Sequence, residues 1–170
     1  MANKKNICVI GMVPDFTNGI AESLSDKLDM FFANVNDLIE FDLIDIAETE
    51  VICGRDYLLK IEQKKVREVC TYENTIITLD YSILNDDENI RTIKENCLLI
   101  YIKLDKDNFL KKFKASKKSN DFNELLFNDR DFICSNIADL TVECNELTQK
   151  ESIDLLLEEI KRYYIVNGSI

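Results

Sequence analysis

Three short apolar runs constrain the fold of this chain more than any other feature of its sequence. The runs are rich in β-branched and aromatic residues, and none alternates cleanly between apolar and polar positions. They are NICVIG at 6–11, NTIITL at 74–79 and CLLIYIKL at 97–104. This pattern is typical of strands that are buried on both faces, as in a parallel sheet. The rest of the chain must therefore supply helices to cover each face.

Helical patterns of apolar residues lie between these runs and after the last of them. They cover residues 20–28, 57–69, 88–95, 106–113 and 151–164. The last pattern, ESIDLLLEEIKRYY, is the clearest, because its isoleucine and leucine residues form one stripe and its acidic residues another. Strands that alternate with helices predict right-handed crossover connections. We therefore expect an α/β fold of three layers, with a parallel β-sheet flanked by helices.

The length and composition predict a single domain. The chain has 170 residues, of which 46% are hydrophobic and 31% charged, as is ordinary for one globular domain. We expect that domain to span residues 1–170. Within it, residues 115–128 (ASKKSNDFNELLFN) lose the apolar period, which indicates a mobile polar excursion. No apolar run is long enough to cross a membrane and no secretory signal begins the chain, so we expect a cytoplasmic protein.

The charge and the residue usage exclude several functions. A net charge of −11 makes nucleic acid and anionic membranes poor partners. The chain has no histidine, which excludes His-dependent catalytic triads and His-based metal sites. Its six cysteines are scattered and form no CxxC pair, so we expect reduced thiols, several of them in the core, rather than disulfides.

The stretch after the first run, GMVPDFTNG, raises the question of a phosphate-binding loop. Such a loop follows the pattern G-x-x-x-x-G-K-[ST], since its glycines let backbone N–H groups converge on phosphate while its lysine and hydroxyl hold phosphate and magnesium. Gly11 fits the first position, but Phe16, Thr17 and Asn18 stand where the glycine, lysine and hydroxyl are needed. The loop also contains a proline, which has no N–H, and an aspartate. The alternative is an ordinary strand–turn–helix connection without a ligand.

The opening of the chain nevertheless resembles that of shikimate kinases. NICVIG, the loop and IAESLSDKLDMFFANVNDLIE are similar to the first segments of these P-loop kinases, and the similarity extends to the final helix. The family phosphorylates the 3-hydroxyl of shikimate with ATP and magnesium, so the resemblance implies a P-loop NTPase-like fold and a place in aromatic amino acid biosynthesis. The family's D-x-D pair, which contacts substrate and magnesium, corresponds to Asn34 and Asn36. An amide lacks the charge that magnesium prefers.

Two further substrate motifs of the family are matched in outline but altered at their key positions. GRDYLLKIE at 54–62 resembles G-E-x-x-F-R-x-x-E, with Leu59 in place of the arginine that binds the shikimate carboxylate. The G-G-G beside the substrate corresponds to Asp80, Tyr81 and Ser82. We therefore expect a substrate pocket that is crowded by side chains and lacks one of its anion-binding groups.

One ligand-contacting residue of the family is retained. NDRDFICSNIAD at 128–139 resembles N-x-R-x-P-x-Y-x-x-x-A-D, and the second substrate-binding arginine corresponds to Arg130. Residues 115–128 correspond to the lid that closes over the nucleotide, where Lys117 and Lys118 lie near the position of the family's arginine. Since lysine lacks the planar fork of arginine, it could replace that residue only as a point charge.

The resemblance and the losses together favour one hypothesis. It is a catalytically inactive shikimate kinase-like protein, a pseudoenzyme with no catalytic residue, metal or cofactor, which binds or regulates an unknown protein or small-molecule partner. Phosphoryl transfer depends on positioning and electrostatics, so the loss of all these groups together removes its mechanism. Phe16, Phe31, Phe32 and Tyr81 are candidates for an apolar contact in the altered cleft, and their alternative role is packing in the vacated pocket.

Two alternatives remain open. One is an active shikimate kinase, or a related ATP-dependent small-molecule kinase, that uses ATP and magnesium in a rebuilt site with Lys117 or Lys118 and with Asp15 or Asp80. The other is a structural subunit that forms an oligomer through its acidic helices or through its C-terminal segment YYIVNGSI.

Overall fold

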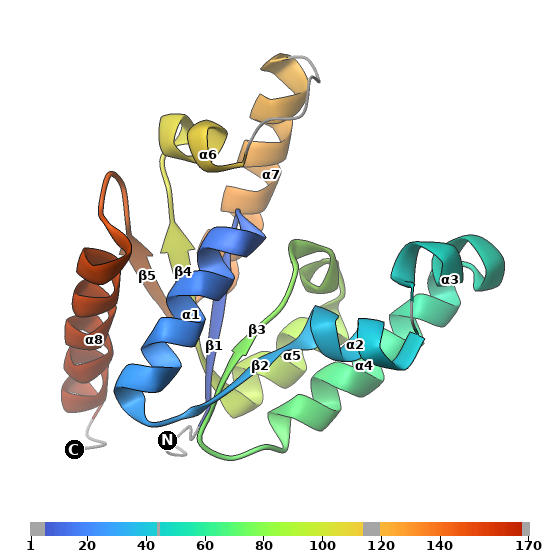
Figure 1. The fold of residues 1–170 in the computed structure, drawn as a ribbon, viewed down its shortest axis with the longest axis horizontal. Helices are drawn as coiled ribbons and strands as arrows, with labels where there is room; N and C mark the ends of the chain where they lie inside the picture. Colours follow the sequence, from blue (N-terminus) through green and yellow to red (C-terminus); the bar gives the residue numbers. More distant parts are fainter. Residues whose placement is uncertain (1–5, 44, 114–119, 168–170) are drawn as a thin grey trace.

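The chain folds around one parallel sheet of five strands. The computed structural model describes residues 6–43, 45–113 and 120–167. The strand order is β2-β3-β1-β4-β5, and each adjacent pair is parallel. Figure 1 shows helices on both sides of the sheet, which confirms the expected three-layer α/β fold. The strands are β1 (Asn6–Gly11), β2 (Phe31–Asn34), β3 (Thr75–Thr78), β4 (Cys97–Lys103) and β5 (Leu140–Glu143).

The helices divide between the two faces of the sheet. α1 and α8 contact each other on one face, whereas α4, α5 and α7 lie on the other (Figure 1). They are α1 (Pro14–Leu28), α2 (Val35–Leu43), α3 (Ile46–Cys53), α4 (Arg55–Cys70), α5 (Asp87–Asn96), α6 (Lys106–Lys112), α7 (Asn120–Ile137) and α8 (Gln149–Val166), with a 3-10 helix, η1, at Tyr81–Asn85. None of the helices in the described ranges is long and apolar enough to cross a membrane.

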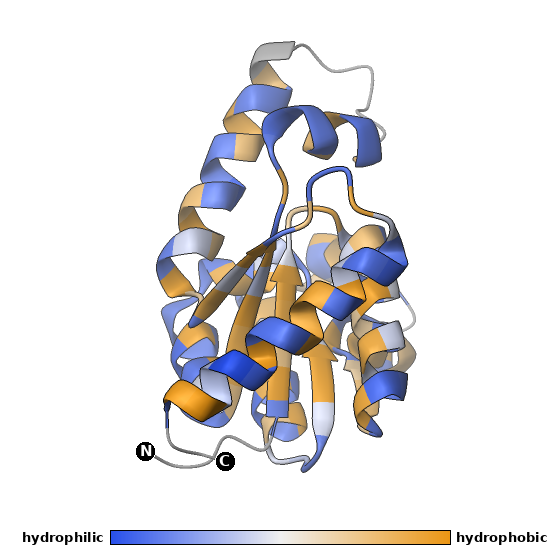
Figure 2. Cartoon of the chain, turned by 90° about the vertical axis from the view of Figure 1, so that its left-hand side faces the viewer, coloured by the Kyte–Doolittle hydropathy of each residue, from blue (hydrophilic) through white to orange (hydrophobic). Residues whose placement is uncertain are grey.

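The two longest strands form the centre of the core. All of β1 except Gly11 and all of β4 except Lys103 is buried, as expected for strands covered on both faces. The two strands pair from Asn6 opposite Cys97 to Gly11 opposite Ile102. Figure 2 shows apolar residues along the strands and hydrophilic residues on the outer sides of the helices. Because the strands are parallel, their carboxyl ends meet at one edge, where ligands bind in folds of this type.

The sequence predicted the buried strands better than the edge strands. β1, β3 and β4 match the three apolar runs, but the four-residue strands β2 and β5 are too short and too exposed to form such a run. The predicted helices are all present, although α1 begins at Pro14 rather than at residue 20. The helices α2 and α3 were not predicted, since neither has a long apolar stripe.

The structure shows a helix in part of the predicted polar excursion. Residues 120–128 are helical and form the first half of α7, whereas residues 114–119, which include Lys117 and Lys118, lie outside the described residues. The reason is a tertiary contact: the ring of Phe127 on α7 lies 5.5 Å from the ring of Phe109 on α6. Packing between two helices stabilised a helix that the local apolar period did not indicate.

Candidate functional site

The turn between β1 and α1 is short and tightly packed. Met12 and Val13 are buried, and α1 begins directly after them at Pro14. Thr17 is buried as well, and its hydroxyl donates a hydrogen bond to the carbonyl oxygen of Val13 at 2.9 Å. A Cβ placed on Gly11 would overlap with the hydroxyl oxygen of Thr17. A glycine is therefore needed at this position to accommodate a neighbouring side chain of the same chain.

A cleft of about 410 Å³ lies beside this turn, between α1, α6 and the start of α8. Phe16 is partly buried at its edge, and the ammonium group of Lys112 lies 4.3 Å from the centre of the Phe16 ring. This is a cation–π contact. Lys111 lines the same cleft, and Asn18 is partly exposed on the first turns of α1. Lys111 and Lys112 were not predicted as site residues, although they end the helix that follows a buried strand.

Asn34 and Asn36 hold backbone groups in place. The side-chain oxygen of Asn34 accepts hydrogen bonds from the backbone N–H groups of Asn36 at 2.9 Å and Asp37 at 3.3 Å, so it caps α2. The side-chain oxygen of Asn36 accepts from the backbone N–H of Asp80 at 2.8 Å, which links the start of α2 to the end of β3. Each amide oxygen at the family's aspartate positions is thus occupied by the protein backbone.

The three residues at the G-G-G position differ in their surroundings. Asp80 is half-buried, Tyr81 is partly buried against the core, and Ser82 is exposed. Burial raises the pKa of the Asp80 carboxyl, and the nearby charge of Arg130 lowers it. The charges of three other carboxylates, on Asp37, Glu40 and Asp15, raise this pKa further. Asp80 therefore lies near other negative charges, and the positive charge of Arg130 compensates part of their repulsion.

An Asp80→Asn variant should be more stable than the natural protein near neutral pH. Because the folded-state pKa of Asp80 is raised, the ionised form costs stability above that pKa, and the cost disappears as pH falls towards the ordinary value of 3.8. We expect a melting temperature higher by a few degrees at about pH 7 and no difference at about pH 3. Scanning calorimetry at both values checks this, with the exposed Asp154→Asn on α8 as the control. An equal rise in melting temperature in both variants would contradict the inference that burial of the Asp80 carboxylate costs stability.

Arg130 on α7 contacts the β1–α1 turn. Its Nη1 donates a hydrogen bond to the carbonyl oxygen of Met12 at 2.5 Å. The guanidinium carbon lies 5.3 Å from the ring centre of Tyr81 and 5.1 Å from that of Phe113. Burial lowers the pKa of Arg130, and its buried Nε has no hydrogen-bond partner among the described residues. The arginine that the resemblance assigns to substrate thus contacts the turn that carries the phosphate-loop positions.

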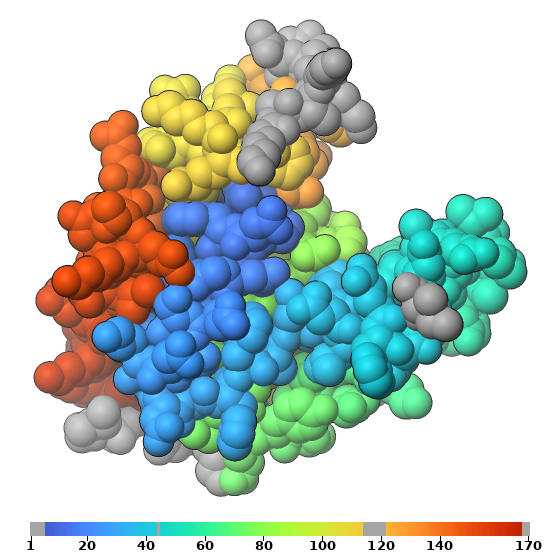
Figure 3. Space-filling model, in the orientation of Figure 1, coloured from blue at the N-terminus to red at the C-terminus, as the bar shows by residue number. Residues whose placement is uncertain are grey.

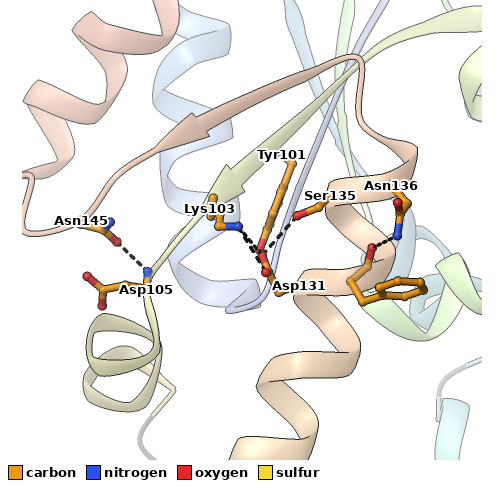
Figure 4. Close-up of polar contacts among 8 residues, drawn as sticks. Tyr101, Lys103, Asp105, Asp131, Ser135, Asn136 and Asn145 are labelled. Atoms are coloured by element: carbon orange, nitrogen blue, oxygen red, sulfur yellow. Dashed lines mark hydrogen bonds and ion pairs between the residues drawn. The ribbon is translucent and has the colours of Figure 1, made fainter.

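The neighbouring residue Asp131 fixes α7 against the sheet. Figure 4 shows its carboxylate accepting hydrogen bonds from the hydroxyl of Tyr101 at 2.9 Å and from the hydroxyl of Ser135 at 3.3 Å. The ammonium of Lys103 lies 3.1 Å from the same carboxylate. Burial, with the bond to Asp131, raises the pKa of Tyr101 well above its usual range. These residues were missed, although Tyr101 and Lys103 share one face of β4 and Asp131 and Ser135 share one face of α7.

A second connection at this edge joins two loops. The backbone N–H of Asp105 donates to the side-chain oxygen of Asn145 at 2.7 Å (Figure 4). This bond holds the start of α6 beside the segment that follows β5. It therefore positions the lysines of α6 at the cleft.

The structure also places an arginine near Leu59. Arg55 lies one helical turn before Leu59 on α4, and its two terminal nitrogens donate to the two carboxylate oxygens of Glu62, each at 2.9 Å. Glu62 is buried, whereas Leu59 is partly buried. No role was predicted for Arg55, although arginine and glutamate seven residues apart lie on one face of a helix.

Phe31 and Phe32 do not join the cleft at the β1–α1 turn. They lie on the edge strand β2 and line a separate cavity of about 450 Å³ with Tyr72. Phe31 is exposed, and Phe32 packs partly on the core. Of the four aromatic candidates, Phe16 and Tyr81 are therefore the two at the carboxyl edge of the sheet.

Three polar side chains at this edge are hydrogen-bonded to the backbone of the protein. The Thr17 hydroxyl donates to a backbone carbonyl, and the Asn34 and Asn36 oxygens accept backbone N–H groups. Pro14, the first residue of α1, has no N–H to offer. Across the described part of the chain, no group of three or more acidic or cysteine residues is arranged to hold a metal ion.

Comparison with known proteins decides the family. A family model described as shikimate kinase matches residues 18–161. The chain belongs to the shikimate kinase family. The match begins immediately after Thr17, so it leaves out the β1–α1 turn of this family member.

Curated and solved shikimate kinases agree over nearly the full length of the chain. The shikimate kinase of Dehalococcoides mccartyi is 23% identical, covering 99% of this chain and 100% of the relative, and that of Clostridium botulinum is 24% identical, covering 96% and 99%. The structure of shikimate kinase from Acinetobacter baumannii in complex with shikimate superposes with a TM-score of 0.82 at 15% identity, covering 95% of each chain. The Aquifex aeolicus shikimate kinase gives 0.80 at 22% identity, covering 92% and 96%.

Proposed function

We propose that this member of the shikimate kinase family has lost phosphoryl transfer and acts as a binding or regulatory module. The observation that carries the proposal is the packing of the β1–α1 turn. Thr17, at the position of the family's phosphate lysine, is buried against Gly11 and donates its hydroxyl to Val13. It offers a ligand neither a positive charge nor a free hydroxyl.

The remaining cleft supports a binding role. About 410 Å³ of space lies next to Phe16, with Lys111 and Lys112 along one wall. The lining has two ammonium groups, one of them over the Phe16 ring, and one carboxylate, that of Asp15. This excess of positive charge beside an aromatic ring suits a small anionic ligand that also has an apolar part. We therefore propose a small anion as the ligand of the cleft and a protein as the partner that responds to it.

An assay of ADP release tests the loss of catalysis. With ATP, magnesium and shikimate, we expect no release above the rate without protein, whereas the Dehalococcoides mccartyi shikimate kinase serves as the positive control. If the phosphate site is lost, magnesium-ATP should bind too weakly to stabilise the fold, because a ligand stabilises a protein only when its concentration exceeds its dissociation constant. We therefore expect magnesium-ATP to raise the melting temperature by less than about 1 °C. ADP release that requires both shikimate and this protein would show that the proposal is wrong.

The lysines of α6 favour one second candidate, an ATP-dependent small-molecule kinase with a rebuilt site. Lys111 and Lys112 supply cations at the cleft that the phosphate-loop positions lack. If this candidate is correct, a Lys111→Met/Lys112→Met variant will lose ADP release by about 100-fold or more, as when charge stabilisation of a transition state is removed. A matched Lys60→Met variant on the exposed face of α4 will keep its rate.

A further inference from the structure

The helices α2 and α3 form a surface of their own, which we call the arm (residues 35–43 and 45–53). Figure 1 and Figure 3 show it, in cyan and teal, projecting from the body of the protein on the side opposite α8. α3 has eight residues and buries none of them fully, although its sequence, IAETEVIC, is largely apolar. Helices this short are not stable on their own in water and depend on packing. The apolar side chains of α3 that point away from the body therefore lack the packing contacts that normally stabilise so short a helix.

Three large apolar side chains of the arm are exposed to solvent. Phe41 is 87% exposed, Val51 86% and Ile52 72%. Ile46 packs partly on the core, and the helical period places Val51 and Ile52 on the side of α3 away from Ile46. Phe41 follows the buried Ile39 by two residues, so it too points away from the core. Exposed apolar residues of this size, gathered on one projecting element, are typical of interaction surfaces.

The charges of the arm specify the kind of partner. Residues 35–53 contain six carboxylates and no lysine or arginine. Asp42 pairs with Lys65 of α4 at 2.8 Å, but Glu40, Glu48 and Glu50 are exposed and have no ion pair within the described ranges. Glu50 also lies near Arg55 of α4, whose pKa its charge raises. Lys65 and Arg55 therefore compensate part of this charge, and the six carboxylates of the arm still leave an excess of negative charge beside its apolar side chains. A second copy of the arm would repel it, whereas a basic surface would be attracted.

We propose that the arm is a docking site for a basic amphipathic helix of a partner protein. The apolar face of that helix would cover Phe41, Val51 and Ile52, and its lysine or arginine residues would lie beside Glu48 and Glu50. Recognition of this kind uses apolar anchors at helical spacing for affinity and flanking charges for orientation. The arm is separate from the cleft beside the β1–α1 turn, so docking does not depend on whether that cleft binds or turns over nucleotide.

Fluorescence anisotropy with a synthetic peptide tests the proposal on the full chain. The probe is a labelled helix of about 18 leucine and lysine residues in amphipathic order, and the matched probe replaces each lysine by glutamate. We expect the lysine peptide to bind and the glutamate peptide not to bind. A Val51→Ser/Ile52→Ser variant should weaken binding by about 10-fold or more, as for loss of central apolar anchors.

Charge variants distinguish the effect of the carboxylates of the arm on binding from the effect of the negative net charge of the whole protein. Glu48→Gln/Glu50→Gln should weaken binding about 3- to 10-fold and reduce its dependence on salt. Asp154→Asn/Glu158→Gln, which removes two exposed carboxylates of α8, should leave binding unchanged. So should Phe132→Ser, which removes a 70% exposed apolar side chain of α7.

Three results would overturn the proposal. The first is no binding of the lysine peptide by the natural protein, and the second is equal binding by the Val51→Ser/Ile52→Ser variant. The third is a dimer in light scattering that this variant abolishes, because the occupant of the arm would then be a second copy of the chain. Circular dichroism of each variant establishes that the fold is intact, and Val51→Ala/Ile52→Ala provides a milder pair that keeps the helix propensity of α3.

Discussion

A Gly11→Ala variant is expected to lose about 2–3 kcal/mol of unfolding free energy, as for an extra methyl group forced into a packed core. The new methyl group would overlap with the hydroxyl of Thr17, which is buried and bonded to the carbonyl of Val13. Neither the strand that holds Gly11 nor the first turn of α1 can move without disturbing the core on both sides. Urea denaturation of the natural protein and the variant measures the difference.

Two further variants show whether the contact with Thr17 is the cause. Gly11→Ala/Thr17→Ala should recover part of the loss, with a coupling of about 1 kcal/mol or more, because alanine lacks the overlapping hydroxyl. Gly19→Ala should instead stabilise the protein by about 0.5–1 kcal/mol, since its Cβ would lie 3.8 Å from the side-chain nitrogen of Gln149, an ordinary van der Waals contact. If Gly11→Ala proved as stable as Gly19→Ala, the turn would be open, as a phosphate-binding loop must be. The expected loss thus distinguishes a packed turn from an anion site.

The central sheet could be predicted because its strands carry their own signal. The runs that became β1 and β4 are apolar throughout, since each is covered on both faces, and the period of α8 is regular. α7 could not be predicted in the same way, because the packing of Phe127 on Phe109 is a contact between two helices that the apolar period of a single segment does not record. α3 was not predicted for the opposite reason: it buries no residue fully, and Val51 and Ile52 face solvent, so its apolar residues follow no burial pattern.

The contacts of the candidate site residues could not be predicted from the sequence. The resemblance directed attention to Thr17, Asn36 and Arg130, and the structure brings their surroundings to the carboxyl edge of the sheet. What each side chain contacts depends on backbone carbonyls and N–H groups, whose positions are set by tertiary structure and leave no sequence pattern. The same is true of Lys112, which reaches Phe16 only because α6 folds back over the turn.

Replacement of Arg130 by methionine should lower the unfolding free energy by about 1–3 kcal/mol, the usual cost of leaving a buried acceptor without its charged donor. Met12, whose carbonyl oxygen accepts the Arg130 bond, is almost completely buried, so water cannot readily replace the guanidinium. Methionine keeps an apolar stem between Tyr81 and Phe113, which limits the change to the polar contacts. The desolvation that lowers the Arg130 pKa offsets part of the loss.

The sign of this change separates two roles for the retained arginine. Residues kept for ligand binding often reduce stability, so their replacement leaves the free energy of unfolding unchanged or raises it. Removal of a residue that holds the β1–α1 turn must instead lower the free energy of unfolding. Arg67→Met is the matched control, because Arg67 is half-exposed and pairs with Glu88 in a surface ion pair that contributes at most about 1 kcal/mol. A loss in Arg130→Met no larger than in Arg67→Met would contradict a role in the turn, and a larger loss would mean that this arginine now stabilises the turn itself.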